Sequence, residues 1–183
     1  MQDRYAGDVG DFGKLALLRG IMDESKGQLK IGIQWYYVPN ESHNKDGKHI
    51  SYLGHQNNYR NCDEALFDEL KGLISNSNRT IHQLESLKAV SGITFFNSKL
   101  SCYVEKYSKG KRTEIRAEWL ESAFDTLKEM NIIYFDPDNG FEVPSVVNKE
   151  KKKASKYIYY DEVERYVNDK KSVIIYQHLF RAC

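Results

Sequence analysis

The sequence predicts an α/β fold, Rossmann-like, in which helices flank a mainly parallel sheet. Helical patterns alternate along the chain with short apolar runs, such as KIGIQWYYV at 30–38 and IIYF at 132–135. Runs that are apolar on both faces are typical of parallel strands covered by helices. The chain has 183 residues, of which 40% are hydrophobic, and this is enough to bury one core. We therefore predict a single α/β domain over residues 1–183.

Spacing and chain breakers predict the elements of the first half. A helix runs from about Phe12 to Met22, because Phe12, Leu15 and Leu18 recur at helical spacing and Asp11 can cap the first turn. The elements after it are a strand at 30–38, a polar loop at 41–58, and helices at 64–74 and 79–87.

In the second half, the clearest helix is TEIRAEWLESAFDTLKEM at 113–130, which carries an apolar stripe. The other elements are strands at 93–97, 132–135 and 172–177, a charged linker at 149–156, and a helix at 160–168.

Polar residues follow three of the predicted strands, at 40–44, 136–139 and 177–178. In open parallel sheets, residues at the carboxyl ends of strands line the ligand crevice. We therefore expect one crevice lined by residues from all three places. The predicted substrate-binding residues there are Glu41, His43, Asn44, Asn139, Glu142, Gln177 and His178.

The opening stretch RYAGDVGDFGK, residues 4–14, raises the question of why glycines and aspartates precede the first helix. Its glycines would let the backbone approach a ligand closely, and Lys14 could reach a phosphate. We predict that this stretch is one wall of an active site and that DPDNG at 136–140 is the other. The alternative is an N-terminal arm that docks on the core through Tyr5, Val9 and Phe12.

Four aspartates are the predicted catalytic residues: Asp8, Asp11, Asp136 and Asp138. Carboxylates brought together raise one another's pKa or bind Mg²⁺, and both effects activate water. The pattern thus favours hydrolysis, by a glycosylase or by a metal-dependent nuclease. Whether base, sugar or phosphate reacts stays open at this point. DPDNG is also a common turn composition, so a plain turn is the competing interpretation.

IIYFDPDNG resembles the end of the fourth strand in Rossmann-fold, S-adenosylmethionine-dependent nucleic-acid methyltransferases, whose motif there is Asp-Pro-Pro-Tyr or a near variant. The resemblance extends to YYDEVERYVNDKKSVIIYQH and loosely to the glycine-rich opening. It implies that Asp136 and Asn139 lie at the target base, with S-adenosylmethionine as cofactor. Asp138 stands for the second proline and Asn139 for the aromatic residue that stacks on a flipped base. The family's glycine-rich cofactor loop has no counterpart in KIGIQWYYVPNESHN after Gly32.

Two basic stretches, KYSKGKR at 106–112 and KEKKKASK at 149–156, could hold a nucleic-acid backbone beside the crevice. Tyr103 and Tyr107 beside the first stretch could stack on bases. The predicted backbone contacts are Lys109, Lys111, Arg112, Lys151, Lys152 and Lys153. Lysine runs on solvated faces are the alternative.

Overall composition limits the remaining choices. The net charge is +1, so a polyanion must meet a local patch. No segment reaches the length of about 18 apolar residues that a membrane span needs, and the start lacks a signal peptide's apolar stretch, so we expect a cytoplasmic protein without a membrane partner. The three cysteines are expected to be free thiols, and metal binding by His43, His49 and His55 is the less favoured alternative to a plain polar loop.

Together these patterns predict an enzyme that hydrolyses nucleic acid or nucleotide. Two alternatives stay open. One is a DNA or RNA methyltransferase, and the other is a non-catalytic module, of phage or defence origin, that binds a nucleotide or DNA.

Overall fold

The computed structural model describes residues 1–40, 49–75, 79–103 and 107–178. They form two compact units, and each is described by itself. Unit 1 contains Met1, residues 30–39 and the chain from Thr94 onward, and unit 2 contains residues 2–29 and 40–93. The predicted α/β class with a mainly parallel sheet is confirmed, whereas the single domain over residues 1–183 stays a prediction.

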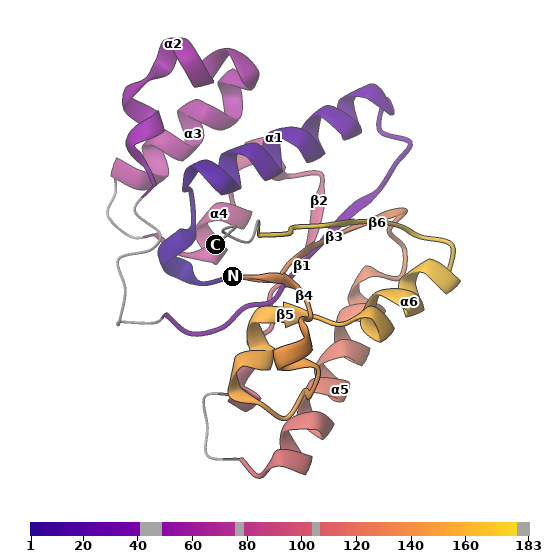
Figure 1. Ribbon diagram of the computed structural model, residues 1–183. Helices are drawn as coiled ribbons and strands as arrows, with labels where there is room; N and C mark the ends of the chain where they lie inside the picture. The colour runs from indigo at the N-terminus through magenta and orange to yellow at the C-terminus, as the bar shows by residue number, and fades with distance from the viewer. Residues whose placement is uncertain (41–48, 76–78, 104–106, 179–183) are drawn as a thin grey trace. The chain divides into compact units, whose positions relative to one another are not determined.

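Unit 1 is built on a four-stranded sheet with the order β2-β1-β3-β6 (Figure 1). The strands are β1 (Ile31–Trp35), β2 (Ile93–Phe96), β3 (Ile132–Asp136) and β6 (Ser172–Ile175). β3 lies parallel to both of its neighbours, with Trp35 opposite Asp136 and Phe135 opposite Ile175. The apolar run of β3 is buried along its whole length, as the sequence predicts.

Two helices, α5 (Lys109–Leu127) and α6 (Tyr160–Asn168), cover one face of this sheet (Figure 1). The end of α5 comes very close to β1, since a Cβ atom at Gly32 would lie 2.8 Å from Leu127 and 2.9 Å from Met130. From α6, the Tyr166 hydroxyl donates to Gln34 Oε1 at 2.9 Å. Side chains alternate along a strand, so Asp136 belongs to the opposite face from Phe135, which packs in the α5–α6 core.

A second, two-stranded parallel sheet lies beyond β3. It pairs β4 (Gly140–Phe141) with β5 (Tyr157–Ile158). Between them run two 3-10 helices, Pro144–Val146 and Lys152–Lys156. The stretch 149–156, expected as a linker, is thus partly ordered into a helical turn that leads directly into a strand.

A buried ion pair joins α5 to α6. Arg116 donates from Nε to Glu162 Oε1 at 2.7 Å and from a terminal nitrogen to Oε2 at 3.0 Å, and both side chains are 1% exposed. The Tyr36 hydroxyl donates to Glu162 Oε2 at 2.8 Å. Burial alone would lower the pKa of Arg116, but the charge and hydrogen bonds of Glu162 raise it above its ordinary value. Burial, followed by the nearby Glu162, raises the pKa of Tyr36 well above its usual range.

The same arginine also holds the chain before β5. Its terminal nitrogens donate to the carbonyls of Ala154 at 3.0 Å and Tyr157 at 2.9 Å. Tyr103, which accepts a bond from Arg116 at 3.1 Å, donates its hydroxyl to the Lys149 carbonyl at 2.7 Å. The lysine-rich segment is therefore fixed at both ends by buried side chains.

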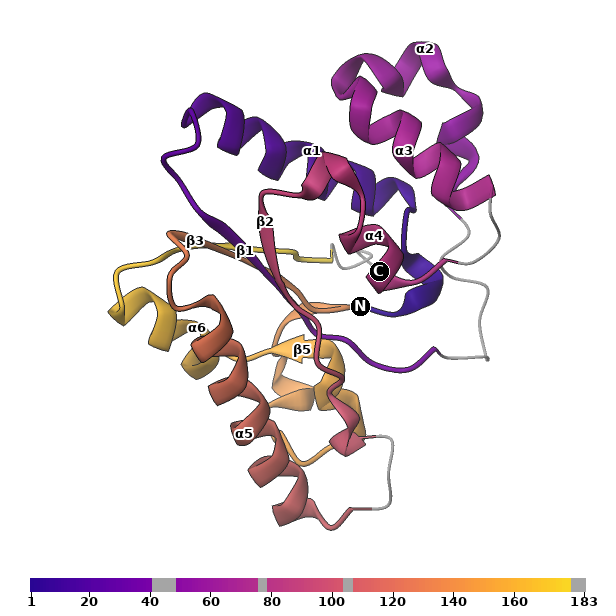
Figure 2. The same cartoon turned by 180° about the vertical axis from the view of Figure 1, so that it is seen from behind.

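Unit 2 is helical in the residues that the structure describes (Figure 2). Its α-helices are α1 (Val9–Glu24), α2 (Gln56–Tyr59), α3 (Glu64–Ser75) and α4 (Ile81–Glu85). Phe12 of α1 stacks on Tyr52 with ring centroids 5.5 Å apart and meets Phe67 of α3 edge-on at 5.9 Å. These aromatic contacts tie α1 to α3, which lie side by side in both views.

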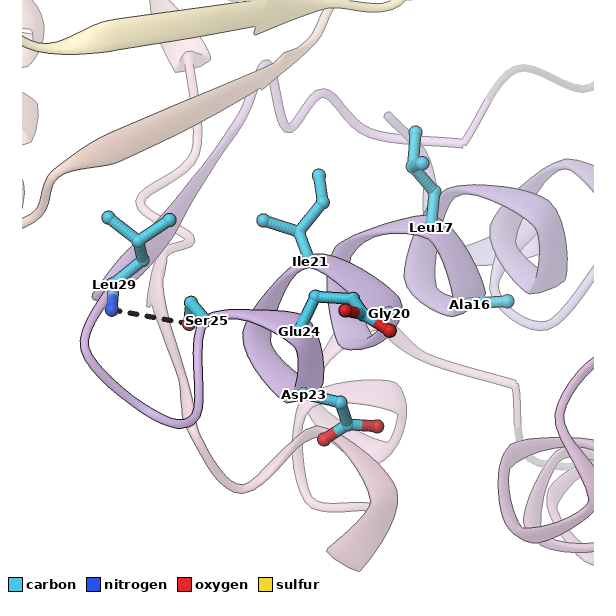
Figure 3. A pocket seen from close by; sticks show the side chains of 8 residues that line it. All are labelled: Ala16, Leu17, Gly20, Ile21, Asp23, Glu24, Ser25 and Leu29. Atoms are coloured by element: carbon cyan, nitrogen blue, oxygen red, sulfur yellow. Dashed lines mark hydrogen bonds between the residues drawn. The ribbon is translucent and has the colours of Figure 1, made fainter.

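A hollow runs along α1 and the turn after it (Figure 3). Its lining residues are Ala16, Leu17, Gly20, Ile21, Asp23, Glu24, Ser25 and Leu29. The backbone N–H of Leu29 donates to the Ser25 hydroxyl at 3.3 Å and closes one end. The sequence-predicted site residues of α1, Asp11 and Lys14, are not among the lining residues.

Among the helices of the described residues, none is long and apolar enough to cross a membrane.

Candidate functional site

The strand order of unit 1 places a crevice position at the carboxyl ends of β1 and β3. β2 lies on one side of β1 and β3 on the other, so the direction of the chain connections reverses between these two strands. In open α/β sheets, ligands bind outside the carboxyl ends of the strands at such a reversal. The residues that leave the sheet here are Tyr36, Tyr37 and Val38 after β1 and the segment 137–142 after β3, which Asp136 ends.

Asp136 and Asp138 both lie at this position. The Asp136 residue is 3% exposed and is the last residue of β3. Asp138 accepts a hydrogen bond from the Met1 amino group at 2.6 Å, and its side chain is 8% exposed. Pro137 between them ends the strand. Two carboxylates are therefore brought to the place where the sheet predicts a ligand.

The loop after Asp138 is held by Gln177, two residues after the end of β6. Gln177 accepts a bond from Phe141 N at 2.9 Å and donates to the carbonyls of Asn139 at 3.4 Å and His178 at 3.1 Å. The expectation that the ends of β3 and β6 converge is therefore met for Gln177. Its amide group is engaged with the backbone, so Gln177 positions the loop. His178 is exposed, with its ring 6.2 Å from that of Tyr176.

Gly140 is required in this loop by its backbone conformation, and a side chain there would displace the amide group of Gln177. Its φ is +94°, and a Cβ atom would lie 2.3 Å from Gln177 Oε1. We expect Gly140→Ala to lower the free energy of unfolding by about 2–3 kcal/mol, from backbone strain plus one lost hydrogen bond. Gly72→Ala is the matched control, since nothing lies within 4 Å of a Cβ there and alanine favours the helix. Urea denaturation measures both, and equal stability of Gly140→Ala and the parent chain would contradict the role of this glycine.

The segment 156–160 lies directly against the same loop. Asn139 N donates to the Lys156 carbonyl at 2.9 Å, and Glu142 N donates to the Ile158 carbonyl at 2.9 Å. Glu142 Oε1 accepts from Tyr160 N at 3.2 Å, at the start of α6. The side chain that was expected to bind substrate therefore also caps a helix. The rings of Phe141 and Tyr160 stack with centroids 4.4 Å apart, and Tyr160 is 64% exposed.

The opening stretch belongs to unit 2, where its polar groups have local partners. Asp8, rather than the expected Asp11, caps α1, because its side chain accepts from Asp11 N at 3.0 Å. Asp11 is buried, accepts from Gly7 N at 2.9 Å and pairs with Lys14 at 2.8 Å. Both aspartates thus have structural roles. That they face Asp136 and Asp138 across one site stays a prediction.

Variants of Asp8 separate its capping role from a catalytic one. Asp8→Ala should lower the free energy of unfolding by about 1 kcal/mol, because an N-cap acceptor is lost, whereas Asp8→Asn should keep the cap and the stability. Thermal denaturation tests this pair. If Asp8 also acts in catalysis, Asp8→Asn loses turnover at unchanged stability. Equal melting temperatures for Asp8→Ala and Asp8→Asn would argue against the cap.

The structure describes only some of the other residues that the sequence predicts for a site. Glu41, His43 and Asn44 lie outside the described residues. Of the loop histidines, the His49 carbonyl accepts from Val9 N at 3.0 Å and His55 is exposed. Cys62 is a free, exposed thiol. Within residues 1–40, 49–75, 79–103 and 107–178, no three His, Cys, Asp or Glu side chains are grouped so that they could hold one metal ion.

The two basic stretches meet in unit 1. Lys109, Lys111 and Arg112 form the first turn of α5, which begins four residues before the predicted start at Thr113. Arg112 donates to the Glu150 carbonyl at 3.0 Å, next to Lys151, Lys152 and Lys153. All five lysines are exposed. Tyr103 is 6% exposed and packs in the core, so its expected stacking on a base is wrong.

Sequence reasoning missed Tyr160 and Lys156 as neighbours of the DPDNG loop. The sequence gives one local signal for them: Lys156 lies shortly before the predicted helix at 160–168, and Tyr160 is the first residue of that helix. Their approach depends on the pairing of β4 with β5, a contact between segments that are far apart in the chain. Nothing in the sequence predicted that the Met1 amino group would pair with Asp138.

The backbone groups after β1 form hydrogen bonds with other segments of the chain. The Met1 amino group donates to the Tyr36 carbonyl at 2.7 Å, Val38 N donates to the Met1 carbonyl at 2.9 Å, and Leu100 N donates to the Tyr37 carbonyl at 2.8 Å. The resemblance to methyltransferases stays a prediction, and it implies a glycine-rich loop at this place that holds S-adenosylmethionine. Buried tyrosines with engaged carbonyls do not fit the cofactor in that way.

Comparisons of the chain with protein-family models, with curated proteins and with solved structures find no match.

Proposed function

We propose that the chain is an enzyme that hydrolyses a bond in a nucleic acid or a nucleotide at the carboxyl ends of β1 and β3. The observation that carries the proposal is the position of Asp136 at the end of β3 and of Asp138 in the loop after it, where the strand order reverses. Groups from β6 and from residues 156–158 hold this loop in place. A fixed carboxylate next to a ligand crevice is suited to take a proton from water.

The two aspartates take different roles in this proposal. One oxygen of Asp138 is bound by the Met1 amino group, so Asp138 positions neighbouring groups. Asp136 takes the proton of the attacking water. The water oxygen bonds to the sugar C1′ or to phosphorus, and the bond to the leaving group breaks with its electron pair on that group. Asn139, half-buried in the adjoining turn, orients the substrate.

Magnesium is the cofactor that this site would accept. Mg²⁺ is commonly held by one or two carboxylates together with substrate oxygens, and Asp136 and Asp138 would supply such a pair. When bound, it would lower the pKa of a coordinated water. The proposal therefore names both a metal-free and a Mg²⁺-dependent form of hydrolysis, which one experiment separates.

The test is a substrate panel analysed by mass spectrometry. The chain is incubated with single- and double-stranded DNA and RNA, unmodified and base-modified, and with free nucleotides, each in Mg²⁺ and in EDTA. We expect a released base, a shortened strand or a nucleoside in at least one condition. Loss of the product in EDTA assigns the metal-dependent form. A base released equally in both assigns the glycosidic form.

Two results would overturn the proposal. Unchanged masses across the panel, with binding retained, would identify a non-catalytic binding module. A mass gain of one methyl group in a parallel reaction with S-adenosylmethionine would identify a methyltransferase. Asp136→Asn is the variant that tests the proposed base in this assay. Asp125→Asn, which alters an exposed carboxylate of α5, is its control for the general effect of losing a negative charge.

A further inference from the structure

Unit 1 carries a concentrated positive surface next to the candidate site. The basic surface consists of Lys109, Lys111, Arg112, Lys151, Lys152 and Lys153. Its two parts are 38 residues apart between Arg112 and Glu150, and one hydrogen bond of 3.0 Å joins them. The overall charge of the chain is only +1, so this surface is a local feature that the composition hides.

Buried contacts fix the basic surface in place. Arg116 donates to the carbonyls of Ala154 and Tyr157, and Tyr103 donates to that of Lys149. The Tyr159 hydroxyl donates to the Val146 carbonyl at 2.7 Å. Like charges on Lys151, Lys152 and Lys153 repel one another, and the fold holds them together at the surface all the same. A polyanion would relieve this repulsion.

The segment that carries these lysines continues into the candidate site. Lys156 and Ile158 accept backbone bonds from Asn139 and Glu142, in the loop that follows Asp136 and Asp138. Two residues after Ile158, the exposed ring of Tyr160 stacks on Phe141. The segment that carries the lysines and the exposed Tyr160 ring are therefore both joined to the same loop.

From this arrangement we infer that the basic surface and Tyr160 together bind a single-stranded nucleic acid, with phosphates on the lysines and a base on the Tyr160 ring. Single-strand binding sites combine a positive track for the backbone with aromatic rings on which unpaired bases stack. The inference rests on the proposed function and names its substrate as a polymer with unpaired bases, because several lysines and one aromatic ring match a chain of phosphates and a base.

The charges around the surface favour a strand over an anionic membrane. Glu114 and Glu118 are exposed on the turns of α5 next to Lys111, and Glu114 pairs with Lys111 at 2.9 Å. Asp161 follows Tyr160 directly and pairs with Lys149 at 2.5 Å. The anionic surface of a membrane is flat, so it would lie close to these carboxylates and be repelled by them. A flexible strand can pass between them, touching one positive group after another.

Fluorescence anisotropy with labelled single-stranded DNA and RNA tests the inference, using the full chain in the Asp136→Asn background so that turnover does not interfere. Replacing Lys151, Lys152 and Lys153 by glutamine should weaken binding about tenfold or more and reduce the slope of log K against log salt by about 2. Lys71, Lys88 and Lys128 are exposed lysines elsewhere, and their triple replacement by glutamine should leave the slope unchanged.

Tyr160 gives an independent readout. Tyr160→Ala should weaken single-strand binding roughly tenfold at an unchanged salt slope, whereas Tyr160→Phe keeps the ring and the affinity. Duplex DNA, whose bases are already stacked, should not respond to Tyr160→Ala.

The inference is wrong if the lysine variant binds single strands like the parent, if Tyr160→Ala does so, or if anionic vesicles bind with the same lysine dependence while oligonucleotides do not. Because binding and turnover are measured separately, an intact lysine and Tyr160 dependence without any hydrolysis would overturn only the proposed function.

Discussion

Replacing Arg116 by methionine should lower the free energy of unfolding by about 3–5 kcal/mol, because the buried Glu162 would lose its bidentate partner and keep, among the described residues, only Lys149, at 3.4 Å, as an ion pair. Both side chains are 1% exposed, so water cannot replace the lost interaction at low cost. Arg116 also donates to the carbonyls of Ala154 and Tyr157, which would lose their donors. Urea denaturation followed by circular dichroism gives the change directly.

A double variant separates the effect of breaking the ion pair from the effect of changing side-chain shape. Arg116→Met combined with Glu162→Gln removes both charges. Its cost should be clearly less than the sum of the two single variants, because each single variant leaves one buried charge behind and the double variant leaves none. The surface pair Arg165 and Glu121 is the matched control on the same two helices. Arg165→Met should cost no more than about 1 kcal/mol. Strict additivity at Arg116 and Glu162 would contradict the coupling.

Asp136→Asn should reduce kcat on the substrate found by the panel by about 10²–10⁴-fold, because the amide cannot accept the proton of water. Asparagine has nearly the same shape, so KM and the melting temperature should change little. Steady-state kinetics and thermal denaturation of the same preparations test both statements.

A second aspartate sharpens this test. Asp138→Asn removes the charge that balances the Met1 amino group, so we expect lower stability and a smaller loss of kcat than for Asp136→Asn. Asp125→Asn should match the parent in both measurements. If Asp136→Asn retains full kcat while Asp138→Asn does not, the assigned base is wrong and the two roles are exchanged.

The strands and the long helices were predictable because their signals are local. The apolar run at 132–135 predicts β3, and burial of every residue of that strand follows from its composition. The start of α5 was placed too late because SKGKR reads as a loop, whereas Ser108 caps the helix there by accepting from Lys111 N. Likewise, two aspartates three residues apart could each have capped α1, and geometry selects Asp8.

The candidate site was predictable only in part, since much of it depends on contacts between distant segments. The turn at 136–140 and its approach to Gln177 follow from strand ends in a parallel sheet. The pairing of β4 with β5 involves two residues on each side, too few to leave a pattern. Burial of Arg116 could be read from its helix, because Arg116 shares a helix face with Trp119 and Ala123. Its partner Glu162 could not, because it lies 46 residues away.

The backbone ladder between residues 139–142 and 156–158 couples the candidate site of unit 1 mechanically to the lysine-bearing segment. A ligand that opens the turn after Asp138 must break amide bonds to the lysine-bearing segment, and a strand that pulls on that segment must strain the turn. In the proposed function, binding of a polymer and access to the carboxylates would therefore be coupled, and release of a processed strand would be one concerted step.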